Sequence, residues 1–328
     1  SYTGTRTLSR ASNGMLNRIS EAMIMNLIRL ILIFSVCLCA RLSAAEIMIL
    51  GVAQDAGYPQ ALCYKPHCLP GWQNKEKRLT ATAIAVINLP GRSKLLFEAT
   101  PHMPEQLYQL EQAAPSDLFK LDGVFLTHAH IGHYTGLMFF GHEAVGAHKT
   151  PVYVMPRMSA YLRENGPWSQ LVKYKNIDLK PLQNETTVDI KGIQVTPVLV
   201  PHRDEFSETV GYFIKGPSKT ALFIPDINKW QLWDKNLIEQ VKSVDYALID
   251  ATFFEDGEIP GRAMADIPHP FVVESMAMFA DQPDSEKAKV HFIHMNHTNP
   301  LLNAASEQTK EVLKAGFNIA RPGMRLAL

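Results

Sequence analysis

The chain has 328 residues, in which 32 lysines and arginines balance 32 aspartates and glutamates. This balance leaves no excess of positive charge for binding nucleic acid, so the expected partner is a small-molecule substrate. The sequence contains no internal repeat, heptad pattern or low-complexity linker, which excludes solenoid and coiled-coil proteins.

The first 45 residues have the pattern of a leader. An apolar run covers residues 27–40, and the small residues that signal peptidase prefers follow it at 43–45. The run is too short to cross a bilayer comfortably. We expect an upstream extension over residues 1–22, a signal peptide over 23–45, one folded domain over 46–328, and export to the periplasm or outside the cell. No stable membrane insertion is expected after cleavage, although an uncleaved tether is the alternative. The sequence gives no indication of the oligomeric state.

Apolar stretches with the periods of strands and helices alternate along residues 46–328. Strands are predicted over residues 46–52, 82–88, 94–98, 123–127, 152–155, 193–200, 210–214, 220–224, 246–249 and 290–293. Helices are predicted over residues 104–112, 230–240 and 271–279, and another is predicted to begin within 135–142. This order indicates an α/β fold with mixed sheets.

The densest group of metal-ligand side chains follows the strand predicted at 123–127. His128, His130 and His133 lie within six residues of one another, directly after an apolar run. An extended His-x-His places two rings on the same side of a strand end, and the third ring arrives as the chain turns. The three imidazoles can therefore converge on one metal ion.

Four more polar residues stand at or near the ends of later elements. His202 follows the strand at 193–200, Asp226 follows that at 220–224, and His294 follows that at 290–293. His269 precedes the helix at 271–279. A scaffold commonly presents a site in this way, on loops at the ends of its strands.

This order of motifs resembles the metallo-β-lactamase superfamily, whose fold is an αββα sandwich of two mixed sheets flanked by helices. The resemblance covers nearly all of residues 46–328 and implies one or two metal ions, of zinc with iron or manganese as alternatives. It implies that one ion is held by His128, His130 and His202, and that Asp226 bridges to a second ion held by His133 and His294.

One position departs from that pattern. The first motif of the superfamily reads His-x-His-x-Asp-His, whereas this chain has Gly132 in place of the aspartate. The second metal thereby loses an anionic ligand. We expect the second site to be weaker, or to be completed by water or by Asp55 from the loop after the first strand.

Finer similarities point to two branches of the superfamily. Residues 50–60, 249–253, 294–300 and 321–328 resemble the pyrroloquinoline-quinone biosynthesis protein B group. Asp250 in Asp-Ala-Thr, followed by His269, resembles the ribonuclease Z and phosphodiesterase branch, where such a pair assists the leaving group. The resemblance implies that His269 and Asp250 are catalytic, because a carboxylate beside an imidazole fixes its tautomer and supports its cation. The alternative is that Asp250 caps a turn and that His269 is held between Pro268 and Pro270 without a catalytic role.

Two cysteines of the domain lie close together. Cys63, His67 and Cys68 predict either a local disulfide or, equally, a structural zinc site with a fourth ligand from elsewhere. His297, three residues beyond His294, is an alternative metal ligand or a partner of one.

The prediction that follows is a metal-dependent hydrolase. In that reading a metal-bound hydroxide cleaves a small ester, lactone, β-lactam or phosphodiester. The alternatives are an iron-dependent oxidoreductase or hydroxylase of the cofactor-biosynthesis type, and a non-catalytic metal-binding protein.

Overall fold

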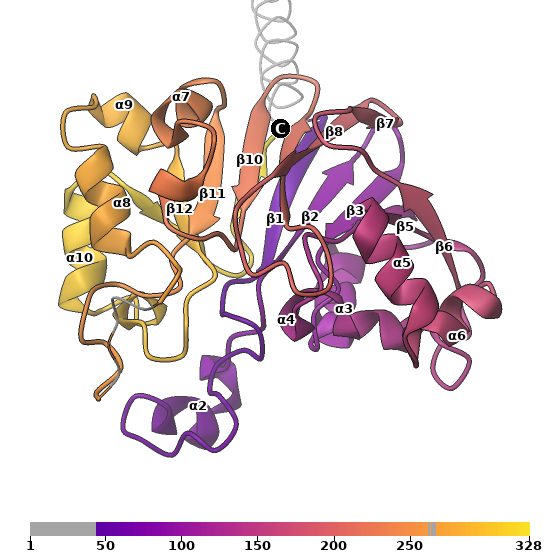
Figure 1. The fold of residues 1–328 in the computed structure, drawn as a ribbon, viewed down its shortest axis with the longest axis horizontal. Helices are drawn as coiled ribbons and strands as arrows, with labels where there is room; N and C mark the ends of the chain where they lie inside the picture. Colours follow the sequence, from indigo (N-terminus) through magenta and orange to yellow (C-terminus); the bar gives the residue numbers. More distant parts are fainter. Residues whose placement is uncertain (1–43, 262, 264–266) are drawn as a thin grey trace, which may run out of the picture. The chain divides into compact units, whose positions relative to one another are not determined.

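In the computed structural model, residues 44–261, 263 and 267–328 are described, and within them the chain forms two seven-stranded sheets (Figure 1). The predicted extension over 1–22 and almost all of the predicted signal peptide over 23–45 lie outside these residues. Ala45 is the first residue of strand β1 (Ala45–Gly51). No helix among the described residues is long and apolar enough to cross a membrane.

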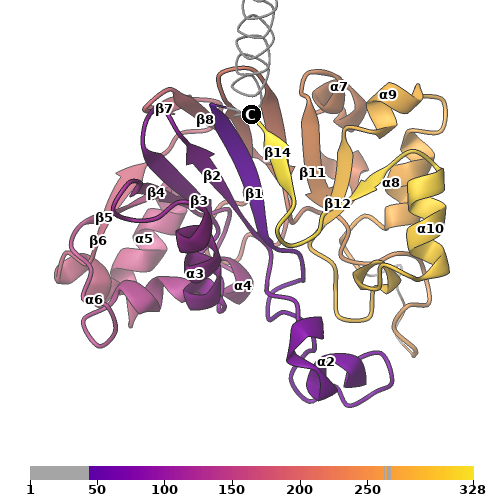
Figure 2. The ribbon, with the colours of Figure 1, turned by 180° about the vertical axis from the view of Figure 1, so that it is seen from behind.

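The first sheet has the order β14-β1-β2-β3-β4-β5-β6. Strands β1, β2 and β3 form an antiparallel meander, and β3 to β6 are parallel. The strand from the C-terminus, β14, pairs with β1, as Figure 2 shows. The bounds of the remaining strands are β2 (Ala83–Asn88), β3 (Ser93–Phe97), β4 (Lys120–Phe125), β5 (Thr150–Val154), β6 (Ile177–Pro181) and β14 (Arg325–Ala327).

The second sheet has the order β13-β12-β11-β10-β9-β8-β7. Strands β10 to β13 are parallel, so their carboxyl ends lie at one edge. Strands β7, β8 and β9 add to them in antiparallel fashion. The bounds are β7 (Val188–Ile190), β8 (Ile193–Leu199), β9 (Val210–Lys215), β10 (Thr220–Ile224), β11 (Tyr246–Asp250), β12 (Val290–Ile293) and β13 (Asn318–Ile319).

Helices flank both sheets. Figure 1 shows α3, α5 and α6 beside the first sheet, and α7 to α10 beside the second. The α-helices are α2 (Leu69–Gln73), α3 (Met103–Ala113), α4 (Ile131–Tyr134), α5 (Pro156–Glu164), α6 (Trp168–Lys173), α7 (Leu237–Lys242), α8 (Val272–Met278), α9 (Asp284–Lys287) and α10 (Glu307–Lys314), and the 3-10 helices are η1 (Lys75–Lys77), η2 (Thr135–Phe140), η3 (Trp230–Leu232) and η5 (Pro300–Leu302).

Aromatic side chains from both sheets meet in the core between them. The ring centroids of Phe97 and Phe125 are 4.8 Å apart, and Tyr212 of the second sheet meets both rings edge-on. The Tyr212 hydroxyl donates to the carbonyl of Leu126, just before the histidine motif. A buried hydrogen bond thus joins the second sheet to the backbone that carries the first histidines.

The predicted αββα sandwich of mixed sheets is confirmed, but two helix predictions are wrong in part. The helix expected over 230–240 is broken into η3 and α7, because Asn236 caps a new start by accepting from the amide of Glu239. The helix expected to begin within 135–142 begins earlier, at Ile131, and continues as the 3-10 helix η2.

Candidate metal centre

The predicted ligands meet where strands of the two sheets end. His128, His130 and His133 follow β4 of the first sheet, while His202, Asp226 and His294 follow β8, β10 and β12 of the second. All six side chains are buried except that of His130, which is 16% exposed. Residues far apart in the sequence are therefore brought to one place, as the motif order predicts.

The first group of ligands is His128, His130, His202 and Asp226, whose donor atoms all lie within 4.8 Å of one another. The Oδ2 atom of Asp226 lies 3.3 Å from Nε2 of His128 and 3.2 Å from Nε2 of His202. The Nδ1 atom of His130 lies 3.2 Å from the same His202 nitrogen. Three imidazole nitrogens and a carboxylate oxygen facing one point are the donor set of a tetrahedral metal site.

The other nitrogen of each of these rings lies against a polar neighbour. Such partners fix which nitrogen faces the metal and make the imidazole a better ligand. The pairs are Thr127 Oγ1 with His128 Nδ1 at 2.9 Å, Glu205 Oε2 with His130 Nε2 at 3.1 Å, and Asn228 Oδ1 with His202 Nδ1 at 3.2 Å.

Asp226 lies between this group and the other buried ligands. Its Oδ2 atom is 3.7 Å from Nε2 of His133, and its Oδ1 atom is 3.2 Å from Nδ1 of His269. Burial opposes ionisation of Asp226, but the surrounding imidazoles, His202 first, hold the pKa of its carboxyl well below its usual range. Asp226 is thus placed to bridge two positions.

The second group is Asp55, His133 and His294, whose donor atoms also lie within 4.8 Å of one another. His133 Nδ1 lies 3.4 Å from the fully buried Glu98 carboxylate, and His294 Nδ1 lies 3.0 Å from Thr252 Oγ1. The His294 ring is therefore oriented by a hydrogen bond at Nδ1, whereas Nδ1 of His133 faces the Glu98 carboxylate without one. Nε2 of both rings is buried without a hydrogen-bond partner in the described part of the chain.

These unpaired atoms test whether a metal fits. A buried donor or acceptor without a partner is costly and rare in a folded protein. In the second group, Nε2 of His133, Nε2 of His294 and Oδ1 of Asp55 are all unpaired within the described ranges of the chain, and these three side chains place donor atoms within 4.8 Å of one another, as a metal centre requires. The chain therefore has a His/Asp metal site.

His269 and Asp250 lie side by side next to this centre. His269 Nδ1 is 2.9 Å from Asp250 Oδ2, and Asp250 is fully buried at the end of β11. Asp250 is itself held by the backbone amides of Ile227 and Thr252. Burial lowers the pKa of the His269 imidazole, but the carboxylates of Asp250 and Asp226 outweigh it and raise that pKa to about 9.

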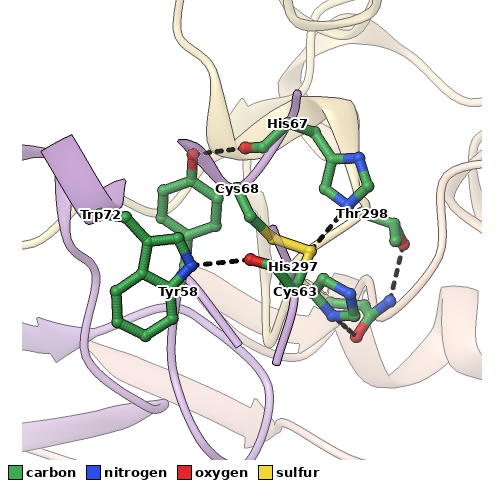
Figure 3. The surroundings of a disulfide bond; sticks show 8 residues. Tyr58, Cys63, His67, Cys68, Trp72, His297 and Thr298 are labelled. Atoms are coloured by element: carbon green, nitrogen blue, oxygen red, sulfur yellow. Dashed lines mark hydrogen bonds between the residues drawn. A yellow bond between two sulfur atoms is a disulfide. The ribbon is translucent and has the colours of Figure 1, made fainter. Parts of the chain in front are cut away.

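The two cysteines lie away from these ligands. The structure joins Cys63 and Cys68 in a disulfide, and Figure 3 shows His67 and His297 beside it. Cys63 Sγ lies 3.4 Å from His67 Nε2, and the rings of His67 and His297 are 5.7 Å apart. His297 therefore belongs to this group and His294 to the metal centre. The four donor atoms also lie within 4.8 Å, so the reduced cysteines would present a zinc donor set.

Comparison with known proteins identifies the family. Residues 93–320 match the family model described as the β-lactamase superfamily domain. The chain belongs to the β-lactamase superfamily. It is 25% identical over 308 residues to the coenzyme PQQ synthesis protein B of Methylobacterium nodulans, covering 86% of this chain and all of that protein.

Solved structures of this superfamily share the fold. The zinc-bound PqqB of Methylobacterium extorquens superposes with a TM-score of 0.72 at 23% identity, over 86% of this chain and all of that one. A diphosphatase of the PhnP family superposes with a TM-score of 0.60 at 20% identity, over 87% of this chain and 98% of that one.

Sequence reasoning missed the residues that orient the ligands. Glu98 is the clearest case, because it is a fully buried carboxylate that lies against His133. Its position at the end of the predicted strand 94–98 was a usable signal, the same one that marked Asp226. Glu205 and Asn228 lie in loops without a comparable pattern, and their roles depend on where those loops fold.

Proposed function

We propose that this superfamily member is a metal-dependent hydrolase acting on a small ester, lactone, β-lactam or phosphodiester. The observation that carries the proposal is the pairing of a His/Asp metal site with the His269–Asp250 pair at its edge. A protein that only stored metal would have no need of an oriented imidazole and carboxylate beside its ligands.

Zinc is the metal that we propose, because imidazole nitrogens and carboxylate oxygens in a group of four suit it and because the similar PqqB structure is described as zinc-bound. When bound, zinc supplies a water molecule of lowered pKa and polarises the bond to be cleaved. His128, His130 and His202 would hold it together with Asp226.

His269 is proposed to transfer a proton to the leaving group. Asp250 accepts from Nδ1 of the ring, which leaves Nε2 as the nitrogen that can face a substrate. The Asp250 carboxylate fixes this tautomer and stabilises the cation. His269 also lines a cavity of about 480 Å³, together with Asp55, Arg203 and Phe253.

This cavity suits a small molecule. It lies within the size range of small-ligand sites, and the described residues that line it include one arginine and no lysine. A long polyanion such as transfer RNA would require a wider basic surface. The predicted export is in keeping with such a substrate and is tested by the N-terminal sequence of protein recovered from cells.

The test is metal analysis of the purified chain followed by a substrate panel at full metal occupancy. We expect zinc to be bound and at least one ester, lactone, β-lactam or phosphodiester to be hydrolysed. The His269→Ala variant should keep its metal and lose about 100- to 10,000-fold in turnover. No hydrolysis at full occupancy would favour a binding protein, and iron retained after anaerobic purification would favour the oxidoreductase.

A further inference from the structure

Gly132 removes the carboxylate that the superfamily motif places next to His133, and the structure puts a different carboxylate there. We propose that Asp55, from the loop after β1, is a ligand of a second metal ion held with His133, His294 and Asp226. This inference rests on the metal binding proposed above but not on hydrolysis.

The first argument is the direction of the donor atoms. Asp55 Oδ1 lies 3.4 Å from His133 Nε2, which in turn lies 3.7 Å from Asp226 Oδ2. Asp55 Oδ1 and the Nε2 atoms of His133 and His294 are all buried, and none has a hydrogen-bond partner among the described residues. The Asp55 side chain is 37% exposed as a whole, so its buried oxygen is the one turned towards the histidines.

The second argument concerns the space beside Gly132. A Cβ atom at position 132 would lie 2.3 Å from the Cα atom of Asp55 and 2.6 Å from its Oδ1 atom. Any larger residue would therefore displace the loop. Glycine at this position allows the Asp55 backbone to approach. The glycine therefore removes the carboxylate of the motif and also leaves room for the carboxylate of Asp55.

The third argument is that the loop is attached to the metal centre. The amide of Gln54 donates to the carbonyl of Met295 at 2.8 Å, which joins the neighbours of Asp55 and His294 directly. Asp55 and His294 have φ values of 37° and 69°, the left-handed region that non-glycine residues seldom adopt. Such a conformation costs about 1–3 kcal/mol and persists where the surrounding structure holds it in place.

The exchange also restores the charge of the centre. Without Asp55 as a ligand, Asp226 would be the single carboxylate shared by two divalent metal ions. Asp55 provides a second carboxylate, which is a hard oxygen ligand that zinc accepts alongside imidazole. The second site then has two imidazoles and two carboxylates from four separate segments.

The experiment measures metal binding in the full chain without any substrate. Metal is removed with dipicolinate, and zinc is titrated back against a chromophoric chelator to give the number of ions and the two dissociation constants. Loss of a group that merely orients a ligand weakens metal binding about 10- to 100-fold, so loss of a direct ligand should reach at least the upper end of that range. We expect Asp55→Ala to weaken the second site about 100-fold or more and to leave the first unchanged.

Two further variants separate the loss of the Asp55 charge from other effects of the substitution. Asp55→Asn retains the shape of the side chain and suits a positive φ, so it removes the charge without straining the loop. It should also weaken the second site. Glu205→Gln is the matched control, because this carboxylate lies 3.1 Å from His130 and should affect the first site instead. Unchanged affinity at the other site shows in each case that the variant is folded.

Three outcomes would overturn the inference. The first is that Asp55→Ala leaves the zinc affinity of the second site unaltered. The second is that Asp55→Asn and Glu205→Gln each lower the zinc affinity of both sites equally. The third is that the wild-type chain binds a single zinc ion. Two ions bound in the predicted way without turnover of any substrate would leave the inference standing and would count against the hydrolase alone.

Discussion

Glu258 provides a stability test that does not involve the metal. Its carboxylate accepts from the amide of Phe254 at 2.6 Å and from the hydroxyl of Thr298. Burial outweighs these hydrogen bonds and raises the pKa of the Glu258 carboxyl from its ordinary 4.5 to about 7. The folded protein therefore holds this proton more tightly than the unfolded chain does.

The sign and size of the effect follow from linkage. Below pH 4.5 the carboxyl is protonated in both states and stability does not change. Between 4.5 and about 7 the unfolded chain loses its proton first, so the free energy of unfolding falls as the pH rises. At about 1.4 kcal/mol per pH unit, the total loss is about 3 kcal/mol and is complete above the folded pKa.

Glu258→Gln should remove this loss, because glutamine imitates the protonated side chain. Its oxygen can accept from the Phe254 amide while its NH2 group donates to the Thr298 hydroxyl. The free energy of unfolding is measured in urea with chelator present, for the variant and the wild type. We expect the advantage of the variant over the wild type to be larger at pH 8.5 than at pH 5 by about 2 kcal/mol. Glu255→Gln, which changes an exposed neighbour, is the control. An equal difference at both pH values would refute the reasoning.

Three other outcomes are expected. Tyr212→Phe leaves the buried carbonyl of Leu126 without its donor and should lower the free energy of unfolding by about 1–3 kcal/mol in urea. Asp250→Asn should lower turnover at least about 100-fold while the metal content, measured by mass spectrometry, is unchanged. Replacing Cys63 and Cys68 by serine should leave the zinc content of the air-purified protein unchanged, whereas the loss of one zinc would show that this pair binds metal.

The sequence predicted much of the metal centre because its ligands directly follow strands. His202, Asp226 and His294 each stand one to three residues beyond an apolar stretch, and a strand of known direction fixes where such a residue emerges. Parallel pairing of β10 to β12 then brings the ends of these strands to one edge. The positions of these residues just after the strands therefore predict that their side chains lie close together in the fold.

The remaining features could not be predicted, because they depend on how loops pack. The broken helix over 230–240 has a continuous apolar pattern, and the cap at Asn236 competes with it only in the folded context. Whether His294 or His297 is the ligand depends on a turn between them, and the structure separates the two rings into different groups. The disulfide and zinc alternatives share one spacing in the sequence, so the spacing alone does not distinguish them.

The two halves of the metal centre differ in what holds them. His128 and His202 follow strands β4 and β8 of the two packed sheets, whose apolar side chains form the buried core. The second group also needs the loop after β1, which carries Asp55 and lines the cavity beside His269. A substrate that moved this loop would therefore displace Asp55 relative to His133 and His294. We expect substrate binding and the affinity of the second metal to be coupled, and coupling between two binding events is reciprocal.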